Sequence, residues 1–251
     1  MFFCSMAYYC DQMHRIAVVV PTYNERESLP MLIELLERTL KDIDKESLVI
    51  IVDDGSPDGT GEIAEELAVK HGNIVVLHRN GKMGLGSAYK DGFEYALYRF
   101  NADIIVQMDA DNSHHPKYIQ DMVKKIQEGN DVVVGSRRVD NGSVVGWGYY
   151  RKSVSSTANR VARMMCGLGI KDVTSGYRAF TSRCLQQINM KEIRSDGYAF
   201  QLEMLYRFKQ LGFDICEVPI TFVDRREGRS KLNSNEMIEF LSTCTRIMFR
   251  R

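Results

Sequence analysis

Short runs of β-branched residues alternate with stretches of helical leucine spacing through the first half of the chain. Arg15–Val20 is such a run and ends at Pro21. After Ser28, which the pattern predicts as a helix cap, leucines recur every three or four residues up to Leu40. Short apolar runs follow at 48–52, 73–77, 103–108 and 131–135. This alternation predicts parallel βαβ units in a doubly wound α/β sheet, covered by helices on both faces.

The alternation weakens after Arg138. Residues 151–166 and 198–211 are predicted to be helical, and 214–223 extended, with Pro219 indicating a sheet edge or a break. Residues 235–249 form an amphipathic pattern that predicts a closing helix. The expected organisation is an N-terminal extension over 1–14 and a single domain over 15–251 with a C-terminal amphipathic helix.

Composition adds an asymmetry to this picture. The 251 residues are 44% hydrophobic and 26% charged with zero net charge, which excludes a disordered chain and a generally basic nucleic-acid coat. Residues 1–120 hold 11 basic and 19 acidic side chains, whereas 121–251 hold 22 and 14. We expect two sites with opposite electrostatic tasks. A shared surface dipole is the simpler alternative.

Several classes of protein are disfavoured by what the sequence lacks. There is no run of 18 apolar residues, so no transmembrane helix is expected, and residues 1–13 make a poor signal peptide. The six cysteines are scattered without a C-x-x-C pair, which fits neither a zinc site nor a disulfide framework. Reduced thiols in a cytosol-facing protein are expected.

Polar residues follow three of the predicted strands, at 23–25, 53–56 and 109–111. In doubly wound sheets, ligands bind at the carboxyl ends of the strands. The carboxylates of Asp109 and Asp111 can point together at one Mg²⁺ or Mn²⁺ ion, which prefers oxygen ligands and keeps substrate phosphates in its shell. The alternative is a solvated acidic loop in which Asp111 caps a helix.

The turn over 53–60 combines Asp, Gly, Ser and Pro, which suit a tight turn, and one of its two leading carboxylates can accept hydrogen bonds from a nucleoside. Motifs of other nucleotide enzymes are missing. No G-x-G-x-x-G follows the first strand, and the glycines at 81–86 do not form a Walker loop. A dehydrogenase or a P-loop NTPase is therefore disfavoured.

The basic half concentrates its charge between Arg137 and Lys171, with seven Lys or Arg against one acid. Arg151 and Lys152 precede serines at a predicted helix start, a combination typical of phosphate sites. A second basic loop over 224–232 could close over a leaving diphosphate. The alternatives are solvated surface, or nucleic acid, for which no binding module is recognisable.

A set of motifs follows in order along residues 16 to 240. These are Val20-Pro21-Thr22-Tyr23-Asn24-Glu25, Asp53-Asp54-Gly55-Ser56-Pro57-Asp58-Gly59-Thr60, Gly84-Leu85-Gly86, Met108-Asp109-Ala110-Asp111 with His114-His115-Pro116, Gly135-Ser136-Arg137, Gly146-Trp147, Thr174-Ser175-Gly176-Tyr177-Arg178, Glu217-Val218-Pro219-Ile220 and Ser230-Lys231-Leu232. In this ordered set, the chain resembles glycosyltransferase family 2 enzymes of GT-A fold and, within them, the short dolichyl-phosphate β-mannosyltransferases without transmembrane helices.

The resemblance implies a role for particular residues. The half over 15–136 would bind donor and metal, and the half over 137–251 the acceptor. Asp109 and Asp111 would hold Mg²⁺ or Mn²⁺, and Ser113 stands where some relatives carry an amide ligand. The guanosine part of GDP-mannose would contact Pro21, Tyr23, Glu25, Val52 and Asp54, and Ala110 would line the same site. Arg225 and Lys231 would close over the diphosphate. The acceptor phosphate would be held by Arg137, Arg151 and Ser155.

The implied reaction transfers mannose from GDP-mannose to dolichyl phosphate with inversion, making the lipid-linked mannose donor for N-glycosylation, GPI-anchor synthesis and O-mannosylation. No dedicated catalytic base is expected, because an acceptor phosphate is largely deprotonated at neutral pH. The C-terminal helix could lie on a membrane surface or dock small membrane-anchoring subunits, and it could equally pack on the core. The expected location is the cytosolic face of the endoplasmic reticulum membrane, without nucleic acid as a partner.

Two other functions stay open on the sequence. A transferase of the same fold could move glucose from UDP-glucose to a polyprenyl phosphate, since spacing does not determine the donor base. A non-catalytic subunit could bind a sugar nucleotide and regulate partners, although the intact Asp109 and Asp111 argue against it.

Overall fold

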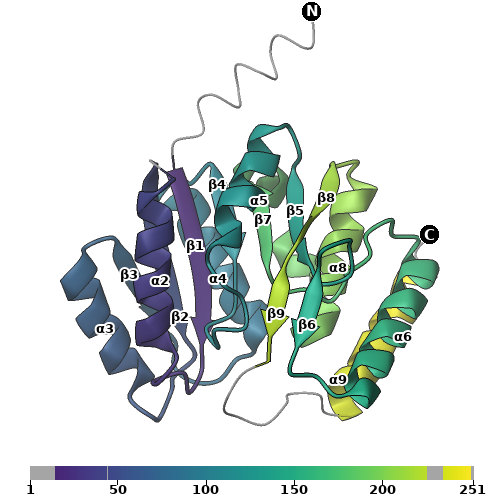
Figure 1. The fold of residues 1–251 in the computed structure, drawn as a ribbon, viewed down its shortest axis with the longest axis horizontal. Helices are drawn as coiled ribbons and strands as arrows, with labels where there is room; N and C mark the ends of the chain where they lie inside the picture. Colours follow the sequence, from purple (N-terminus) through teal and green to yellow (C-terminus); the bar gives the residue numbers. More distant parts are fainter. Residues whose placement is uncertain (1–14, 44, 225–233, 250–251) are drawn as a thin grey trace, which may run out of the picture.

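A seven-stranded sheet crosses the middle of the protein, between two layers of helices (Figure 1). The computed structural model describes residues 15–43, 45–224 and 234–249, so the expected extension over 1–14 lies outside the described residues. The sheet order is β3-β2-β1-β4-β7-β5-β8. Its strands are β1 (Arg15–Thr22), β2 (Glu46–Asp53), β3 (Ile74–His78), β4 (Ile104–Gln107), β5 (Val132–Ser136), β7 (Arg178–Thr181) and β8 (Ile215–Pro219).

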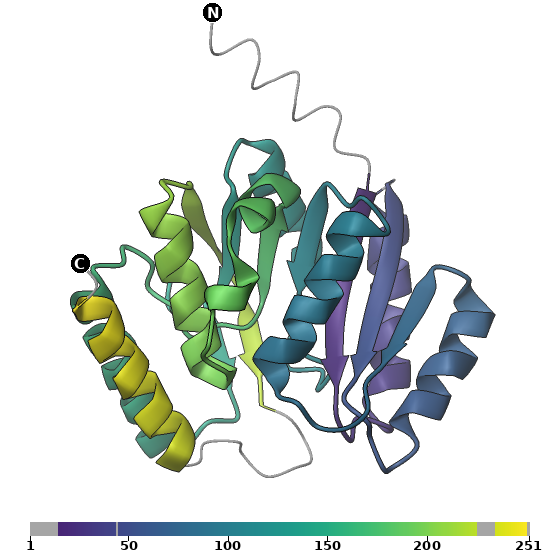
Figure 2. The same cartoon turned by 180° about the vertical axis from the view of Figure 1, so that it is seen from behind.

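The helices cover both faces of the sheet, as the alternating pattern predicts. One face carries α2 (Leu29–Lys41), α3 (Thr60–His71) and α5 (Tyr118–Gln127), and the other carries α4 (Leu85–Tyr98), α7 (Ser182–Gln187) and α8 (Gly197–Gln210), as Figures 1 and 2 show from opposite sides. Alternate side chains of one strand are therefore buried in two separate hydrophobic cores. Ala17 and Val19 pack with α4 and α8, whereas Ile16, Val18 and Val20 pack with α2 and α5.

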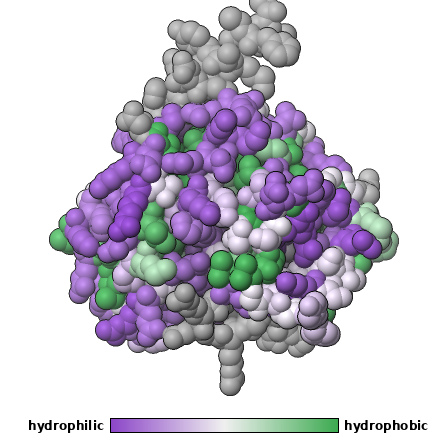
Figure 3. Space-filling model, viewed as in Figure 1, coloured by the Kyte–Doolittle hydropathy of each residue, from purple (hydrophilic) through white to green (hydrophobic). Residues whose placement is uncertain are grey.

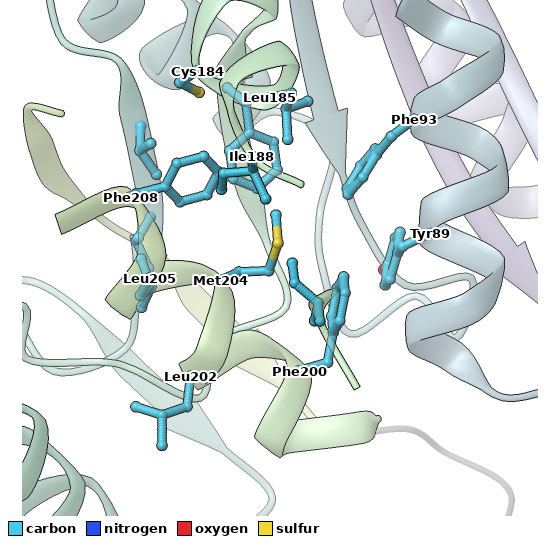
Figure 4. Packing of buried hydrophobic residues seen from close by; sticks show 14 of the residues in the cluster. Tyr89, Phe93, Cys184, Leu185, Ile188, Phe200, Leu202, Met204, Leu205 and Phe208 are labelled. Atoms are coloured by element: carbon cyan, nitrogen blue, oxygen red, sulfur yellow. The ribbon is translucent and has the colours of Figure 1, made fainter. Parts of the chain in front are cut away.

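Aromatic side chains fill the core on the α4 side. Tyr89 and Phe93 point from α4 toward Phe200 and Met204 of α8 (Figure 4). The Tyr89 ring lies 5.7 Å from that of Phe93 and 6.2 Å from that of Phe200, both in stacked arrangements. This packing fixes α4 and α8 relative to the sheet, and both helices begin at the edge where the strand-end residues gather.

The second half of the chain departs from the simple alternation. The sequence predicts no strand over 178–181, yet β7 inserts antiparallel between β4 and β5. The extended stretch 214–223 divides into β8, an edge strand ending at Pro219, and β9 (Thr221–Val223), which confirms the break predicted there. β9 pairs in parallel with β6 (Ser143–Val145) to form a separate two-stranded sheet.

Two long helices complete the molecule beyond β8. These are α6 (Tyr149–Cys166) and α9 (Ser234–Met248), which lie side by side in both views (Figures 1 and 2). Elsewhere, a 3₁₀ turn over Met190–Glu192 precedes α8. The inner face of α9 buries Phe240, Thr243, Cys244 and Ile247, so the expected closing helix packs on the core.

Among the described residues, no helix has both the length and the apolar character needed to cross a membrane. The four cysteines in this part of the chain form no disulfide. Hydrophilic side chains cover most of the face in Figure 3, where apolar ones gather mainly in the lower half.

The predicted cap of α2 is confirmed in its position but not in its hydrogen bond. Ser28 stands at the N-cap of α2 but makes no capping hydrogen bond with its side chain. Its hydroxyl instead donates to the Glu25 carboxylate, Oγ to Oε2 2.5 Å, and to the Glu25 carbonyl oxygen at 3.2 Å. Because Ser28 has helical backbone angles, its side chain faces back to the preceding turn.

Candidate functional site

The strand-end residues meet in one cavity at the carboxyl edge of β1, β2 and β4. This edge is the place where doubly wound sheets bind ligands. Most of the residues that the sequence analysis assigns to donor, metal and acceptor line this one cavity; they are Pro21, Tyr23, Glu25, Asp54, Asp109, Ala110, Asp111, Arg137 and Arg151.

Two of the assigned residues that the structure describes do not line it, and two others lie outside the described residues. Val52 is fully buried and packs in the hydrophobic core on the α4 side of the sheet, and it is not among the residues that line the cavity. Ser155 lines an adjoining cavity instead. Arg225 and Lys231 lie outside the described residues. The basic loop over the diphosphate therefore stays a prediction.

Asp109 is held in place by two buried side chains. The Tyr89 hydroxyl donates to Asp109 Oδ1 at 2.9 Å, and the backbone N–H of Asp109 donates to His114 Nδ1 at 3.2 Å. Burial, with the nearby Asp109, raises the pKa of Tyr89 well above its ordinary value, so the phenol keeps its proton and can donate. Burial lowers the pKa of His114, which favours the neutral imidazole that can accept the Asp109 N–H.

Asp111 is oriented by its own loop. The backbone N–H and hydroxyl of Ser113 both donate to Asp111 Oδ1, at 3.1 and 2.5 Å. Between the two carboxylates, Ala110 is 3% exposed. The geometry leaves Asp109, whose side chain is one-third exposed, and Asp111 on the wall of the cavity.

This donor set fits a divalent cation that shares its shell with a substrate. No group of three or more His, Cys, Asp or Glu side chains is placed to hold a metal in the described ranges. Mg²⁺ is commonly held by one or two carboxylates together with substrate phosphates. The two aspartates therefore suit a metal that binds with a diphosphate better than a metal held by protein alone.

The turn after β2 divides its two carboxylates between separate tasks. Asp53 shapes the turn, since it accepts from Thr22 Oγ1 at 3.1 Å and from Ser56 Oγ at 2.6 Å. Asp54 Oδ2 accepts the backbone N–H groups of Met83 and Gly84, at 3.0 and 3.1 Å. Asp54 thus fixes the loop that leads into α4 and also lines the cavity.

Two cations at the donor end were not assigned from the sequence. Buried Arg79 pairs with Asp54 (Nη1 to Oδ1 2.7 Å). Lys82 lines the cavity with its Nζ 4.2 Å from the centre of the Tyr23 ring. Lys82 belongs to the glycine-containing run at 81–86, for which the sequence predicts only that it is not a Walker loop.

The two arginines assigned to the acceptor phosphate, Arg137 and Arg151, line the cavity and are each paired with an acid. Arg137 makes a two-pronged ion pair with fully buried Asp172, Nε to Oδ2 2.7 Å and Nη2 to Oδ1 2.7 Å. Burial alone would lower the pKa of Arg137, but Asp172 raises it above the ordinary value. Arg151 pairs with Asp224 at 2.8 Å, and Arg138, which the sequence analysis left unassigned, donates to Ser155 Oγ at 2.7 Å.

A buried arginine fixes the backbone next to the cavity. Arg178 is completely buried and donates to three backbone carbonyls, those of Val173, Ser175 and Gln201. Burial lowers its pKa to about 9. The segment that it holds includes Gly176, where an added Cβ would lie 3.4 Å from Asp109 Oδ2. The sequence shows Arg178 only as part of a motif, without a role.

A second, mostly apolar cavity adjoins the first. Arg137, Thr174 and Tyr198 line both. Its apolar wall comes from α6 and α9 through Val154, Ala158, Met237 and Phe240. Polar and apolar binding surfaces thus meet at Arg137.

Comparison with known proteins agrees with this arrangement. The model of glycosyl transferase family 2 matches residues 17–188. The chain belongs to this family. It is 41% identical over 226 residues to the polyprenol monophosphomannose synthase of Mycolicibacterium smegmatis, covering 90% of this chain and 83% of that protein. It is 43% identical over 232 residues to the undecaprenyl-phosphate mannosyltransferase of Micrococcus luteus, covering 92% and 93%.

Solved structures of other proteins share the fold. Glucosyl-3-phosphoglycerate synthase of Mycobacterium tuberculosis with Mg²⁺ and UDP has a TM-score of 0.69 at 22% identity, covering 98% of this chain and 83% of that one. The same enzyme with Mn²⁺, UDP-glucose and phosphoglyceric acid has a TM-score of 0.67 at 22% identity, covering 96% and 83%. The family member therefore has the expected GT-A fold, a mostly parallel sheet flanked by helices.

Proposed function

We propose that this glycosyltransferase moves mannose from GDP-mannose to a polyprenyl monophosphate. One observation carries the proposal: a polar cavity with paired carboxylates joins an apolar cavity at an arginine, Arg137. The first suits a sugar nucleotide, the second the chain of a lipid, and the arginine a phosphate between them. Two relatives above 40% identity, named as polyprenol-phosphate mannosyltransferases, support this assignment.

The donor occupies the carboxylate end in this proposal. Pro21, Tyr23, Glu25 and Asp54 contact the guanosine part. Asp109 and Asp111 would hold Mg²⁺ or Mn²⁺, which would supply positive charge against the negative charge that develops as GDP leaves. Tyr89 keeps the Asp109 carboxylate in position through its hydrogen bond. Glucosyl-3-phosphoglycerate synthase, of the same fold, was crystallised with either metal.

The acceptor phosphate lies between Arg137 and Arg151, and one of its oxygens attacks the anomeric carbon. A phosphate with its second pKa near 6 is largely dianionic at neutral pH, so no side chain has to remove a proton. The arginines orient the oxygen and screen its repulsion from the diphosphate. In-line attack inverts the configuration, from an α-linked donor to a β-linked product.

The lipid chain leaves the site along α6 and α9. The outward face of α9 exposes Met237, Ile238, Leu241 and Met248. This uncharged stripe, at helical spacing, suits a membrane surface. Dolichyl phosphate as the natural acceptor, small anchoring subunits, the cytosolic face of the endoplasmic reticulum and the supply of N-glycosylation, GPI-anchor synthesis and O-mannosylation stay predictions that rest on the resemblance.

The purified protein tests the proposal with two donors and two acceptors. We expect GDP release and a mannosyl lipid only when GDP-mannose, a divalent metal and a polyprenyl phosphate are all present. Dolichyl phosphate and undecaprenyl phosphate separate the two kinds of acceptor. Turnover with UDP-glucose instead of GDP-mannose would support the alternative donor, and an α-linked product would exclude inversion.

A variant tests the metal site. Asp111→Ala should abolish turnover while the circular dichroism spectrum stays that of the wild type, because the carboxylate acts on the cation and not on the fold. Glu66→Ala, an exposed acid on α3, is the matched control and should keep full activity. Retained turnover in Asp111→Ala would contradict the metal role, and binding of GDP-mannose without turnover in the wild type would favour a regulatory subunit.

A further inference from the structure

Trp147, the single tryptophan of the chain, lies against both arginines assigned to the acceptor phosphate. The Arg151 guanidinium carbon lies 4.2 Å from the centre of its ring, and that of Arg137 lies 5.6 Å away. Guanidinium groups at such distances are attracted to the negative face of an indole. One aromatic side chain therefore acts on two cations that would otherwise repel each other.

Neighbouring aromatic rings fix the position of the indole. Trp147 packs edge-to-face on Phe222 at 5.6 Å, and Phe222 packs edge-to-face on His114 at 5.8 Å. His114 accepts the backbone N–H of Asp109. Contacts between side chains thus connect the indole with the carboxylate loop at the donor end, so the two ends of the site have a defined separation.

Carboxylates bind the same two arginines. Asp172 binds Arg137, and Asp224 binds Arg151 at 2.8 Å. Each guanidinium therefore contacts both an acid and the indole. Arg137 donates from Nε to Asp172 and from Nη2 to Asp172 and Thr174, which leaves Nη1 for a ligand.

Trp147 also belongs to the wall of the apolar cavity. It lines that cavity with Arg137, Ser155 and Phe240. Its indole N–H is buried and has no acceptor among the residues that the structure describes. A buried donor without an acceptor is costly, and an incoming anion would satisfy it.

We propose that Trp147 is the positioning residue of the acceptor-phosphate site. Its ring holds Arg137 and Arg151 where the two cavities meet. Its N–H donates to a phosphate oxygen of the bound isoprenyl phosphate. The inference rests on the proposed function for the identity of the acceptor. It adds a role for the Gly146-Trp147 motif, to which no function was assigned above.

The wild-type protein provides a direct test, because all tryptophan emission comes from this site. We expect citronellyl phosphate, a soluble ten-carbon isoprenyl phosphate, to change the intrinsic emission saturably in the absence of donor. Citronellol, which lacks the phosphate, should leave the emission unchanged. Calorimetric binding of citronellyl phosphate without any change in emission would overturn the proposal.

Substitutions separate positioning from packing. Trp147→Phe keeps an aromatic ring but loses the N–H, and Trp147→Leu loses both. We expect the acceptor KM to rise roughly tenfold in Trp147→Leu and by a smaller factor in Trp147→Phe, with the donor KM within about twofold of the wild type. Tyr98→Leu, an exposed aromatic at the far end of α4, is the control and should change neither constant.

The outcomes distinguish this inference from the proposed function. If the wild type transfers no mannose to any polyprenyl phosphate, the proposed function fails. If the wild type transfers mannose and the Trp147 variants keep the wild-type acceptor KM, only the present inference fails. Equal rises of donor and acceptor KM with a lowered melting temperature would assign Trp147 to packing and would also overturn it.

Discussion

At the scale of single residues, the site is held together by buried polar pairs before any ligand arrives. Tyr89 holds Asp109, Arg79 holds Asp54, and Asp172 holds Arg137. Such partners fix the orientation of groups that will face a substrate, so the cost of ordering them is met during folding rather than at binding.

Removing the Tyr89 hydroxyl should weaken the metal site without unfolding the protein. In Tyr89→Phe the ring packing stays, but Asp109 loses a hydrogen bond, and loss of such an outer partner commonly lowers metal affinity by about 10- to 100-fold. We expect a fall of roughly tenfold, measured as Mn²⁺ binding by electron paramagnetic resonance in the presence of GDP. Tyr98→Phe on the same helix is the control, and unchanged Mn²⁺ affinity in Tyr89→Phe would contradict the role.

Asp172→Asn should destabilise the fold, because it leaves the Arg137 guanidinium, whose side chain is 6% exposed, without its counter-charge. Breaking a buried pair in this way costs about 3 kcal/mol. We expect this fall in the free energy of unfolding, measured in urea at pH 7. Asp140→Asn, at an exposed acid, should change it little; an equal loss in both variants would contradict the argument.

The same pair predicts a pH dependence. Burial would raise the pKa of Asp172, but Arg137 lowers it below the ordinary value of 3.8. The Asp172 carboxylate therefore takes up a proton at a higher pH in the unfolded chain than in the folded one. Its contribution to the stability of the fold is complete above about pH 3.8 and is lost as the pH falls through the pKa of the folded state. Urea titrations between pH 6 and pH 2 should show a smaller acid-induced loss in Asp172→Asn than in the wild type.

At the scale of elements, close approach of α4 to the sheet sets the shape of the donor end. A Cβ on Gly92 would lie 2.3 Å from Cγ1 of Val19 on β1. At the start of the same helix, Gly84 has φ +100°, and a Cβ there would meet the Asp196 carboxylate at 2.3 Å. Glycine at these positions lets α4 lie against β1 and α8 at once.

Gly92→Ala should therefore destabilise the protein although alanine favours helix. Pushing α4 away from β1 costs roughly 1–3 kcal/mol, as overpacking of a core does. Urea denaturation measures the loss. Gly169→Ala is the control, since an added Cβ there meets nothing within 4 Å; a stabilised Gly92→Ala protein would contradict the close approach.

At the scale of the whole molecule, the polar cavity lies at one edge of the sheet while α6 and α9 extend beyond β8. α9 has two apolar faces with different tasks. Phe240 and Ile247 are buried on the inner one, whereas Ile238 and Leu241 are 65% and 49% exposed on the outer one. Packing on the core is thus confirmed for the inner face, and binding of the outer face to a membrane surface or to anchoring subunits stays a prediction.

Charges on the outer face of α9 should weaken binding to vesicles and leave the fold intact. For Ile238→Glu combined with Leu241→Glu, we expect at least about a tenfold weaker partition into vesicles of anionic phospholipid, because each buried apolar side chain contributes roughly 1.5–3 kcal/mol. Sedimentation with vesicles measures it. Val69→Glu, 87% exposed on α3, controls for added charge; equal partition of all three proteins would argue against a membrane role for α9.

The sequence by itself determined the alternation of strands and helices up to β5 and the placing of Asp54, Asp109 and Asp111 at strand ends. These features are local, since periodicity and turn chemistry depend on residues that are near one another along the chain. Tertiary structure alone decided the antiparallel β7, because a four-residue strand that begins with the buried Arg178 has no strand pattern of its own.

The partners of the site residues were likewise decided only by the fold. Tyr89 and Asp109 are 20 residues apart, Arg137 and Asp172 are 35 apart, and their hydrogen bonds depend on how α4, β4 and β5 are packed. Trp147 appears in the sequence as half of a short motif, and only the folded chain places it against Arg137 and Arg151. The types of side chain at the strand ends can be predicted from the sequence, whereas the pairing of groups that are distant along the chain follows from the path of the backbone.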